Sequence, residues 1–283
     1  MSEDKRLKLN FLPNCGKPIT ITDVKVIAVA NQKGGVGKTT TTANLAASIA
    51  ETGAHVLVID LDPQGNLSSA LGVEPIHEKS IYYVMIGEKT LLDQVQPTPC
   101  ENLSIISSNI HLAGCEVEIA KMEDPMYHLR KIVDAQRDSL HFDVILLDCP
   151  PSLGILMGNG LGAADAVLVP LQCEYFALEG LSKIIEVIQH VRGHEGVALL
   201  LDGIVFTMYD ARTNLARQVV EDVRGHMGDK VYKTFIPRSI RFGEAPSHGK
   251  PITSYDPSGI GAQSYRQLAK EFMKRHEIRP RVQ

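Results

Sequence analysis

The sequence has no tryptophan, and aromatic residues make up only 5% of its 283 residues. It also lacks any run close to the roughly 18 consecutive apolar residues of a membrane-spanning helix, and its first twenty residues lack the apolar centre of a signal peptide. Disordered and collagen-like compositions are excluded because 44% of the residues are hydrophobic and 22% are charged. We therefore expect a soluble, cytoplasmic globular protein.

Paired cysteines are also missing. The five cysteines stand singly, with no CxxC pair and no histidine at metal-ligand spacing, at Cys15, Cys100, Cys115, Cys149 and Cys173. This pattern excludes a disulfide framework and a zinc site, and it favours ordinary buried thiols.

Charge is unevenly distributed along the chain. Residues 1–203 contain 15 basic and 25 acidic residues, a balance of −10, whereas residues 204–283 contain 14 and 8, a balance of +6. A basic final quarter on an acidic protein indicates a polyanionic partner, although a solvated helical surface would give the same count.

Short apolar segments alternate with helical patterns along most of the chain. Strands are predicted at 24–30, 55–60, 103–107, 143–148, 166–170, 198–207 and 231–236, and helices at 39–52, 125–139, 178–191, 214–227 and 258–275. Near-continuous apolar strands between helices predict an α/β fold, a mostly parallel twisted sheet with helices on both faces. We expect one domain over residues 24–276, after a flexible arm (1–23) and before a short tail (277–283).

A glycine-rich turn follows the first predicted strand. Residues 33–40 read KGGVGKTT, in which Gly37, Lys38 and Thr39 fit the phosphate-loop pattern G-x-x-x-x-G-K-[ST], while Gln32 replaces its opening glycine. The chemistry of the pattern is still present. Glycines let backbone N–H groups face an anion at a helix N-terminus, a lysine can reach the outer phosphates, and a hydroxyl can bind Mg²⁺. The sequence therefore predicts a P-loop nucleotide site.

Carboxylates follow two of the predicted strands. Asp60 and Asp62 are two residues apart, so in an extended chain they face the same side of the strand. Asp148 ends an apolar strand, which is the Walker B arrangement that supplies a carboxylate to the Mg²⁺ shell. Such carboxylates can support Mg²⁺ through water and orient an attacking water, although ordinary solvated loop residues would show the same spacing.

Lys33 stands at the start of the turn, ahead of the usual Lys38, and the resulting KGGVGKT resembles the deviant Walker A motif (K-G-G-x-G-K-[ST]) of the ParA/MinD group. In that group the first lysine reaches across an ATP-sandwiched dimer to the partner's nucleotide. The DCPPS block at 148–152 resembles the ParA/Soj partitioning branch, and further matching blocks lie at 172–175, 207–214 and 236–251. The resemblance covers residues 24–275.

The resemblance implies a Mg²⁺-dependent ATPase that forms an ATP-dependent homodimer, binds double-stranded DNA nonspecifically at the nucleoid, and serves a ParB-type partner in segregation. The implied catalytic residues are Lys33, Lys38 and Asp62. Implied nucleotide contacts are Lys33, Gly34, Gly35, Val36, Gly37, Lys38, Thr39, Thr40 and Pro237, and the implied metal-supporting residues are Thr39, Asp60 and Asp148. DNA binding is implied for Arg212 and Arg241; charge alone adds their neighbours Arg217, Arg238, Lys250 and Lys274.

Two other functions remain open. One is a MinD-like membrane-associated division-site ATPase, because the closing helix has an apolar stripe beside basic residues; the short polar tail and the DCPPS block argue against it. The other is a metabolic P-loop enzyme, such as a dethiobiotin-synthetase-like ligase or a nitrogenase iron-protein relative. The latter would need cluster-ligating cysteines, and Cys115 and Cys149 lie near the expected regions.

Overall fold

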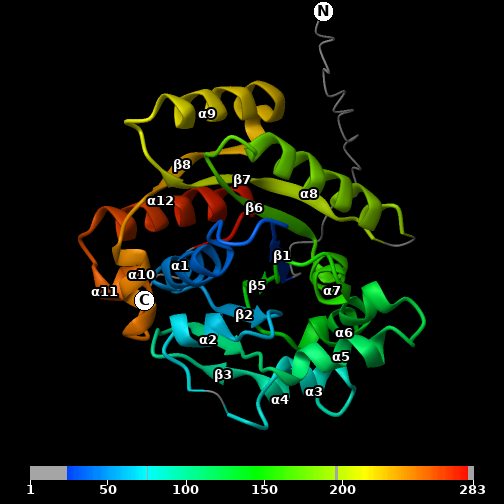
Figure 1. Cartoon of the computed structure of the whole chain (residues 1–283). Helices are drawn as coiled ribbons and strands as arrows, with labels where there is room; N and C mark the ends of the chain where they lie inside the picture. Colours follow the sequence, from blue (N-terminus) through cyan, green and yellow to red (C-terminus); the bar gives the residue numbers. More distant parts are fainter. Residues whose placement is uncertain (1–23, 75, 195–196, 280–283) are drawn as a thin grey trace, which may run out of the picture.

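An eight-stranded sheet forms the centre of the protein (Figure 1). The computed structural model describes residues 24–74, 76–194 and 197–279, so the predicted arm and the last four residues of the predicted tail lie outside the described residues. The strand order is β3-β4-β2-β5-β1-β6-β7-β8, and all neighbours are parallel except β3 and β4. The strands are β1 (Lys25–Val29), β2 (Val56–Asp60), β3 (Gln96–Pro97), β4 (Leu103–Ile106), β5 (Val144–Asp148), β6 (Ala166–Gln172), β7 (Leu200–Tyr209) and β8 (Val231–Pro237).

Both faces of this sheet are buried, which explains why its strands are apolar throughout. In β1, Val26 and Ala28 pack into the hydrophobic core on one face, and Ile27 and Val29 pack into the core on the other. Successive side chains of a strand point to opposite faces, so a strand between two helical layers needs apolar residues at every position. The predicted α/β fold with a mostly parallel sheet is confirmed.

Helices cover the two faces as separate layers (Figure 1). One face carries α1 (Lys38–Ala50), α2 (Asn66–Ala70), α10 (Arg241–Ser247), α11 (Ile252–Tyr255) and α12 (Ile260–Arg275). The other carries α3 (Ile81–Met85), α4 (Leu91–Gln94), α5 (His111–Ile119), α6 (His128–Gln136), α7 (Ile155–Ala163), α8 (Ala177–Arg192) and α9 (Asn214–Met227). Three short 3₁₀ turns, Pro125–Tyr127, Arg137–Ser139 and Gly228–Lys230, complete the described elements.

Several of these elements were not predicted from the sequence. Most of them have only two to seven residues, too few to show a period, as with β3, α2, α3 and α4. The nine residues of α7, ILMGNGLGA, are all half-buried or buried, so the helix has no polar face. The predicted helix at 125–139 is α6 between two 3₁₀ turns, a difference confined to its ends.

The closing helix α12 packs on its own domain. The apolar stripe that left a membrane role open is buried: Tyr265, Leu268, Ala269, Phe272 and Met273 are each at most 5% exposed. Among the described residues, no helix combines the length and apolarity that crossing a bilayer requires. The stripe therefore belongs to the hydrophobic core.

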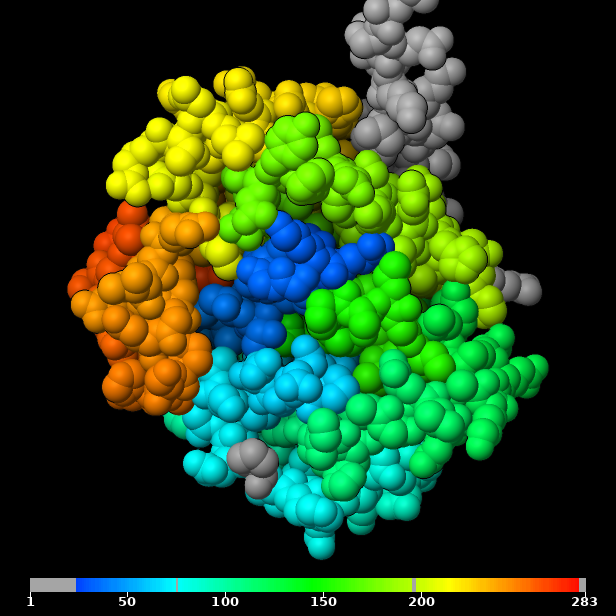
Figure 2. Space-filling view, viewed as in Figure 1, coloured from blue at the N-terminus to red at the C-terminus, as the bar shows by residue number. Residues whose placement is uncertain are grey.

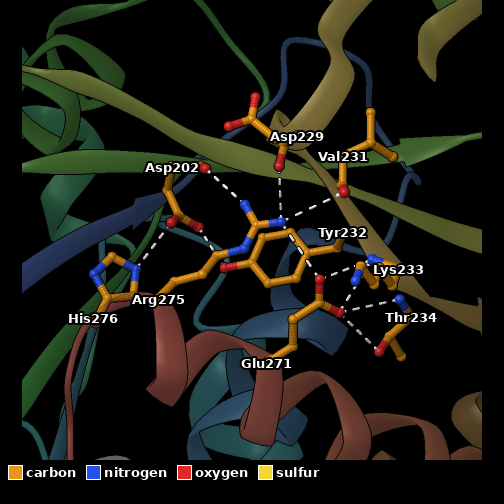
Figure 3. Close-up of polar contacts among 9 residues, drawn as sticks. All are labelled: Asp202, Asp229, Val231, Tyr232, Lys233, Thr234, Glu271, Arg275 and His276. Atoms are coloured by element: carbon orange, nitrogen blue, oxygen red, sulfur yellow. Dashed lines mark hydrogen bonds and ion pairs between the residues drawn. The ribbon is translucent and has the colours of Figure 1, made fainter. Parts of the chain in front are cut away.

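A polar cluster fastens the end of α12 to the amino ends of β7 and β8 (Figure 3). We call it the C-terminal clamp; its members are Asp202, Tyr232, Glu271, Arg275 and His276. The buried Tyr232 hydroxyl donates to Asp202 Oδ2 at 2.7 Å, and His276 Nε2 lies 2.9 Å from Asp202 Oδ1. Arg275 lies over the Tyr232 ring, 3.8 Å from its centroid, and donates to three backbone carbonyls, those of Asp202, Asp229 and Val231. Glu271 accepts from the backbone N–H groups of Lys233 and Thr234.

Candidate active site

The glycine-rich turn lies between β1 and α1, at the carboxyl edge of the sheet, as predicted (Figure 2, blue segment at the middle of this face). Gly35 and Gly37 have φ values of +73° and +85°, which side-chain-bearing residues rarely adopt. A Cβ at Gly34 or Gly35 would project into open space, with nothing within 4 Å. The turn therefore leaves a space at the start of α1, where unpaired backbone N–H groups favour an anion.

The two lysines of the turn have different surroundings. Lys38 is buried at 7% exposure, and its Nζ donates to the backbone carbonyl of Lys33 at 3.2 Å. Burial lowers the pKa of Lys38, and the charge of Asp148 opposes that shift. The side chain of Lys33 is 46% exposed and forms an ion pair with Glu174, in the loop after β6. The amino group of Lys33 therefore lies at the surface, paired with Glu174, and does not share the buried position of Lys38.

Two neighbouring strands bring two carboxylates together below the turn. Asp60 and Asp148 end β2 and β5, are paired in register, and are both almost completely buried. Burial raises the pKa of Asp148 to about 6, against hydrogen bonds from Thr39 and Thr42. Burial and the neighbouring charge of Asp148 also raise the pKa of Asp60 well above its usual range. Two buried acids side by side favour a cation or a proton between them.

Hydroxyl groups of α1 complete this cluster. Thr42 Oγ1 lies 3.0 Å from Asp148 Oδ1, and Thr39 also donates to that carboxylate. Thr39 was predicted from the sequence and Thr42 was not, although a residue three positions later on a helix lies on the same face. Hydroxyl and carboxylate oxygens are the ligands that Mg²⁺ prefers, so Thr39, Asp60 and Asp148 fit a magnesium site.

The expectation that Asp60 and Asp62 share one side of a strand was wrong. The strand β2 ends at Asp60, and the chain then turns. Asp60 accepts from the backbone N–H groups of Asp62 and Leu67, at 3.0 and 3.2 Å, so its carboxylate also holds the turn and the start of α2. Asp62 is half-buried, and its Oδ1 accepts from the Gln64 N–H at 3.0 Å. The side chain of Asp62 is thus fixed outside the buried pair.

A second contact to the glycine-rich turn comes from the other half of the chain. The Thr207 hydroxyl, near the end of β7, donates to the backbone carbonyl of Val36 at 2.8 Å and is buried. Asn31 Nδ2 likewise donates to the Pro170 carbonyl at 2.8 Å, which ties the start of the turn to β6. Neither residue was predicted to have a role in the site. Asn31 adjoins the predicted turn in the sequence, whereas nothing in the sequence connects Thr207 to it.

Most of the candidate DNA-binding residues lie on the same edge of the sheet. Arg212 follows β7, Arg238 follows β8, Arg217 lies on α9, and Arg241 begins α10. Pro237, a predicted nucleotide contact, is the half-buried last residue of β8. Lys274 is the exception: it adjoins Arg275 of the C-terminal clamp, at the amino ends of the strands, so grouping it with the others was wrong.

The cysteines offer no cluster. Cys115 and Cys149 are buried, Cys100 and Cys173 are half-buried, and Cys15 lies outside the described residues. Burial raises the pKa of the Cys149 thiol, so it is an inert packing group, and the structure shows no group of three metal-ligating side chains in the ranges it describes.

Known proteins resemble this chain over most of its length. A family model described as "AAA domain" matches residues 24–199. The sporulation initiation inhibitor protein Soj of Bacillus subtilis is 48% identical over 87% of this chain and 97% of its own length. The chromosome partitioning protein ParA of Caulobacter vibrioides is 46% identical over 90% and 96%, respectively.

Among solved structures, a protein of Mycobacterium smegmatis described as cobyrinic acid a,c-diamide synthase, with bound ADP and magnesium, is 35% identical with a TM-score of 0.76. The match covers 91% of this chain and 97% of that one. The family match and the curated relatives cover most of the chain, including the glycine-rich turn and both buried carboxylates. The chain therefore belongs to the ParA/Soj family of chromosome-partitioning ATPases.

Proposed function

We propose that the chain hydrolyses ATP with Mg²⁺, dimerises around bound ATP, and in that state binds DNA without sequence preference. In the cytoplasm, a ParB-type partner would stimulate hydrolysis at the nucleoid, so that a chromosome or plasmid is moved by cycles of binding and release. The observation that carries this proposal is the separation of the two lysines. Lys38 is buried under the turn, whereas Lys33 points outward to Glu174 and can serve a second copy of the chain.

The residues of the site divide the work in this proposal. The backbone N–H groups of Gly34 to Gly37 and of Thr40 cradle phosphates, and Lys38 neutralises the outer ones. Thr39, Asp148 and Asp60 would hold Mg²⁺, which when bound would offset the charge of the triphosphate. Asp62, whose Oδ1 accepts from the Gln64 N–H, positions the attacking water. Lys33 completes the site of the other subunit, and Pro237 contacts the base.

Asp62→Ala tests the proposed dimer around bound ATP directly, because ATP hydrolysis should stop while ATP binding and dimerisation remain. We expect this variant to sediment as a dimer in saturating ATP and Mg²⁺. Lys33→Ala is the matched variant: it should bind nucleotide yet fail to hydrolyse it. A monomeric Asp62→Ala protein would overturn the sandwich, and undiminished turnover by Lys33→Ala would remove its role across the interface.

The proposed DNA binding is tested by electrophoretic retardation of DNA with ATP, with ADP and without nucleotide, at two salt concentrations. A dimer doubles the number of phosphate contacts, so binding should require ATP and should weaken steeply with salt. Arg212→Glu combined with Arg241→Glu should abolish retardation and leave dimerisation intact. Flotation with liposomes in ATP distinguishes the MinD-like alternative, because a membrane-bound ATPase would float.

The metabolic alternative is consistent with the similarity to the Mycobacterium smegmatis protein described as cobyrinic acid a,c-diamide synthase. A synthase would couple hydrolysis to a small-molecule acceptor. Phosphate release that rises with DNA and partner protein, in the absence of any such acceptor, would exclude this alternative.

A further inference from the structure

Both arginines that the family resemblance assigns to DNA already have an acidic partner in their own chain. Arg212 donates through Nε to Asp210 Oδ1 at 2.9 Å and through Nη2 to Asp210 Oδ2 at 2.7 Å. Arg241 donates through Nη1 to Glu244 Oε2 at 2.8 Å. Arg212 is 88% exposed, so the guanidinium group faces solvent while its charge is offset by a neighbouring carboxylate.

The carboxylate of Asp210 is held in place by its own loop. Asp210 Oδ1 also accepts from the backbone N–H of Arg212 at 3.1 Å, and the hydrogen bonds from Arg212 lower the pKa of Asp210 to about 2. The backbone carbonyl of Asp210 accepts from both the N–H and the hydroxyl of Thr213, which caps α9 by accepting from Ala216. Asp210 therefore remains ionised on a backbone that its loop holds, whereas the exposed guanidinium group of Arg212 can be reached by a second anion from solvent.

The same loop is linked to the phosphate-binding turn. Only two residues separate Asp210 from Thr207, whose buried hydroxyl donates to the Val36 carbonyl. Between them, Met208 has a φ of +49°, a left-handed conformation that long side chains rarely adopt. The end of its side chain lies beside Gly37, about 4.0 Å from the position of a Cβ there. A shift of the turn on binding a nucleotide would therefore reach the Asp210 backbone through a short strained segment.

We propose that Asp210 is a positioning residue that masks Arg212 from DNA phosphates in the nucleotide-free protein, and that the Thr207–Val36 contact makes its release depend on nucleotide. This inference rests on the proposed DNA-binding function. DNA phosphate and Asp210 compete for the same donors, so binding through Arg212 must break or share the ion pair. Removing the negative charge should favour DNA even when no nucleotide is present.

Asp210→Asn is the informative variant, because its amide oxygen can still accept from the Arg212 N–H while the charge is lost. The measurement is fluorescence anisotropy with a mixed-sequence DNA duplex, at several salt concentrations, with ATP, ADP or no nucleotide. We expect the nucleotide-free affinity to rise about three- to tenfold and its salt slope to steepen by up to about one. The ratio of affinities with and without ATP should shrink.

Two controls separate masking from simpler effects. Glu221→Gln, on the exposed side of α9, makes the same change in net charge without touching Arg212. Thr207→Val removes the hydroxyl and should reduce the gain that ATP produces, whereas Thr207→Ser should keep that gain. If Asp210→Asn matches Glu221→Gln, or binds DNA more weakly than the parent, the masking role is overturned. If Thr207→Val responds to ATP as the parent does, the link to the turn is overturned.

The parent protein distinguishes failure of this inference from failure of the proposed function. If the parent does not bind DNA in ATP at low salt, the function itself is wrong. If the parent binds and Asp210→Asn shows none of the expected changes, only the masking role fails.

Discussion

The buried carboxylates at the two ends of the sheet have different partners. At the carboxyl ends, Asp60 and Asp148 lie side by side in the interior, and burial raises the pKa of both. At the amino ends of β7 and β8, the buried Asp202 accepts from the Tyr232 hydroxyl and lies beside His276 (Figure 3). The paired carboxylates of Asp60 and Asp148 lower the stability of the fold in the absence of a cation, whereas the hydrogen-bonded Asp202 raises it. This difference indicates which end binds ligands and which end holds the fold.

Removing the central cation of the C-terminal clamp should have the largest effect on stability. Arg275→Ala loses hydrogen bonds to three carbonyls and the contact with the Tyr232 ring. We expect the free energy of unfolding to fall by about 2–4 kcal/mol, because three carbonyls, two of them in part-buried hydrogen bonds, lose a charged donor and the Tyr232 ring loses its packing partner. Urea unfolding measures this, with exposed Lys274→Ala, its neighbour on α12, as the control. Nucleotide affinity of the folded protein should not change.

An Arg275→Ala protein as stable as the Lys274→Ala control would mean that the clamp does not hold α12. A loss of nucleotide affinity that exceeds the loss of stability would instead connect the clamp to the site. Either result would break the contrast between the two ends of the sheet.

The fold was largely predictable because burial on both faces leaves a strong sequence signal. A strand such as VILLD at 144–148 is apolar at every position, and only helical layers on both sides explain that pattern. The motif residues of the site were predictable too, since Gly37, Lys38, Thr39 and Asp148 occur at fixed places relative to strand ends. Short helices and the two-residue strand β3 were missed because tertiary packing, not a local period, forms them.

Contacts between distant residues were beyond the sequence. Thr207 meets Val36 across 171 positions, and no spacing rule connects them. The pairing of Arg212 with Asp210 is local, yet it was not predicted, because a charge balance over a long segment does not show which acidic residue pairs with which basic one. Asp62 lies at the edge of the sheet, as expected. Its backbone is not extended in line with the strand, because β2 ends two residues before it.

Removing a buried charge at the carboxyl ends of the strands should raise the free energy of unfolding, which Arg275→Ala lowers. Asp148→Asn keeps one acceptor oxygen for the hydroxyls of Thr39 and Thr42 but removes the buried negative charge. The folded-state pKa of about 6 lies above the unfolded value, so the ionised group destabilises the fold above pH 6, and this penalty fades as the pH falls toward 4. At pH 7.5 we expect a gain of about 1–3 kcal/mol in the free energy of unfolding.

Urea unfolding of Asp148→Asn at pH 7.5 and pH 4.5, with the exposed Asp138→Asn as the control, measures this gain. The gain should be smaller at the lower pH, while ATP hydrolysis is lost at both. A destabilised Asp148→Asn at pH 7.5 would show that the buried pair is already balanced, and the contrast with the C-terminal clamp would disappear.

The smallest expected effect on stability is that of the hydrogen bond in the C-terminal clamp, measured apart from the packing of the aromatic ring. Tyr232→Phe keeps the ring under Arg275 but removes the hydroxyl that donates to Asp202 at 2.7 Å. Because the acceptor is a buried carboxylate, we expect a loss of about 1–2 kcal/mol in urea unfolding. The buried Tyr265 is the matched control, since its hydroxyl meets only the neutral Thr41 at 3.3 Å, and Tyr265→Phe should cost less. Equal losses in the two variants would mean that the charge on Asp202 adds nothing, and that Arg275 and the aromatic ring alone hold the amino ends of β7 and β8 to α12.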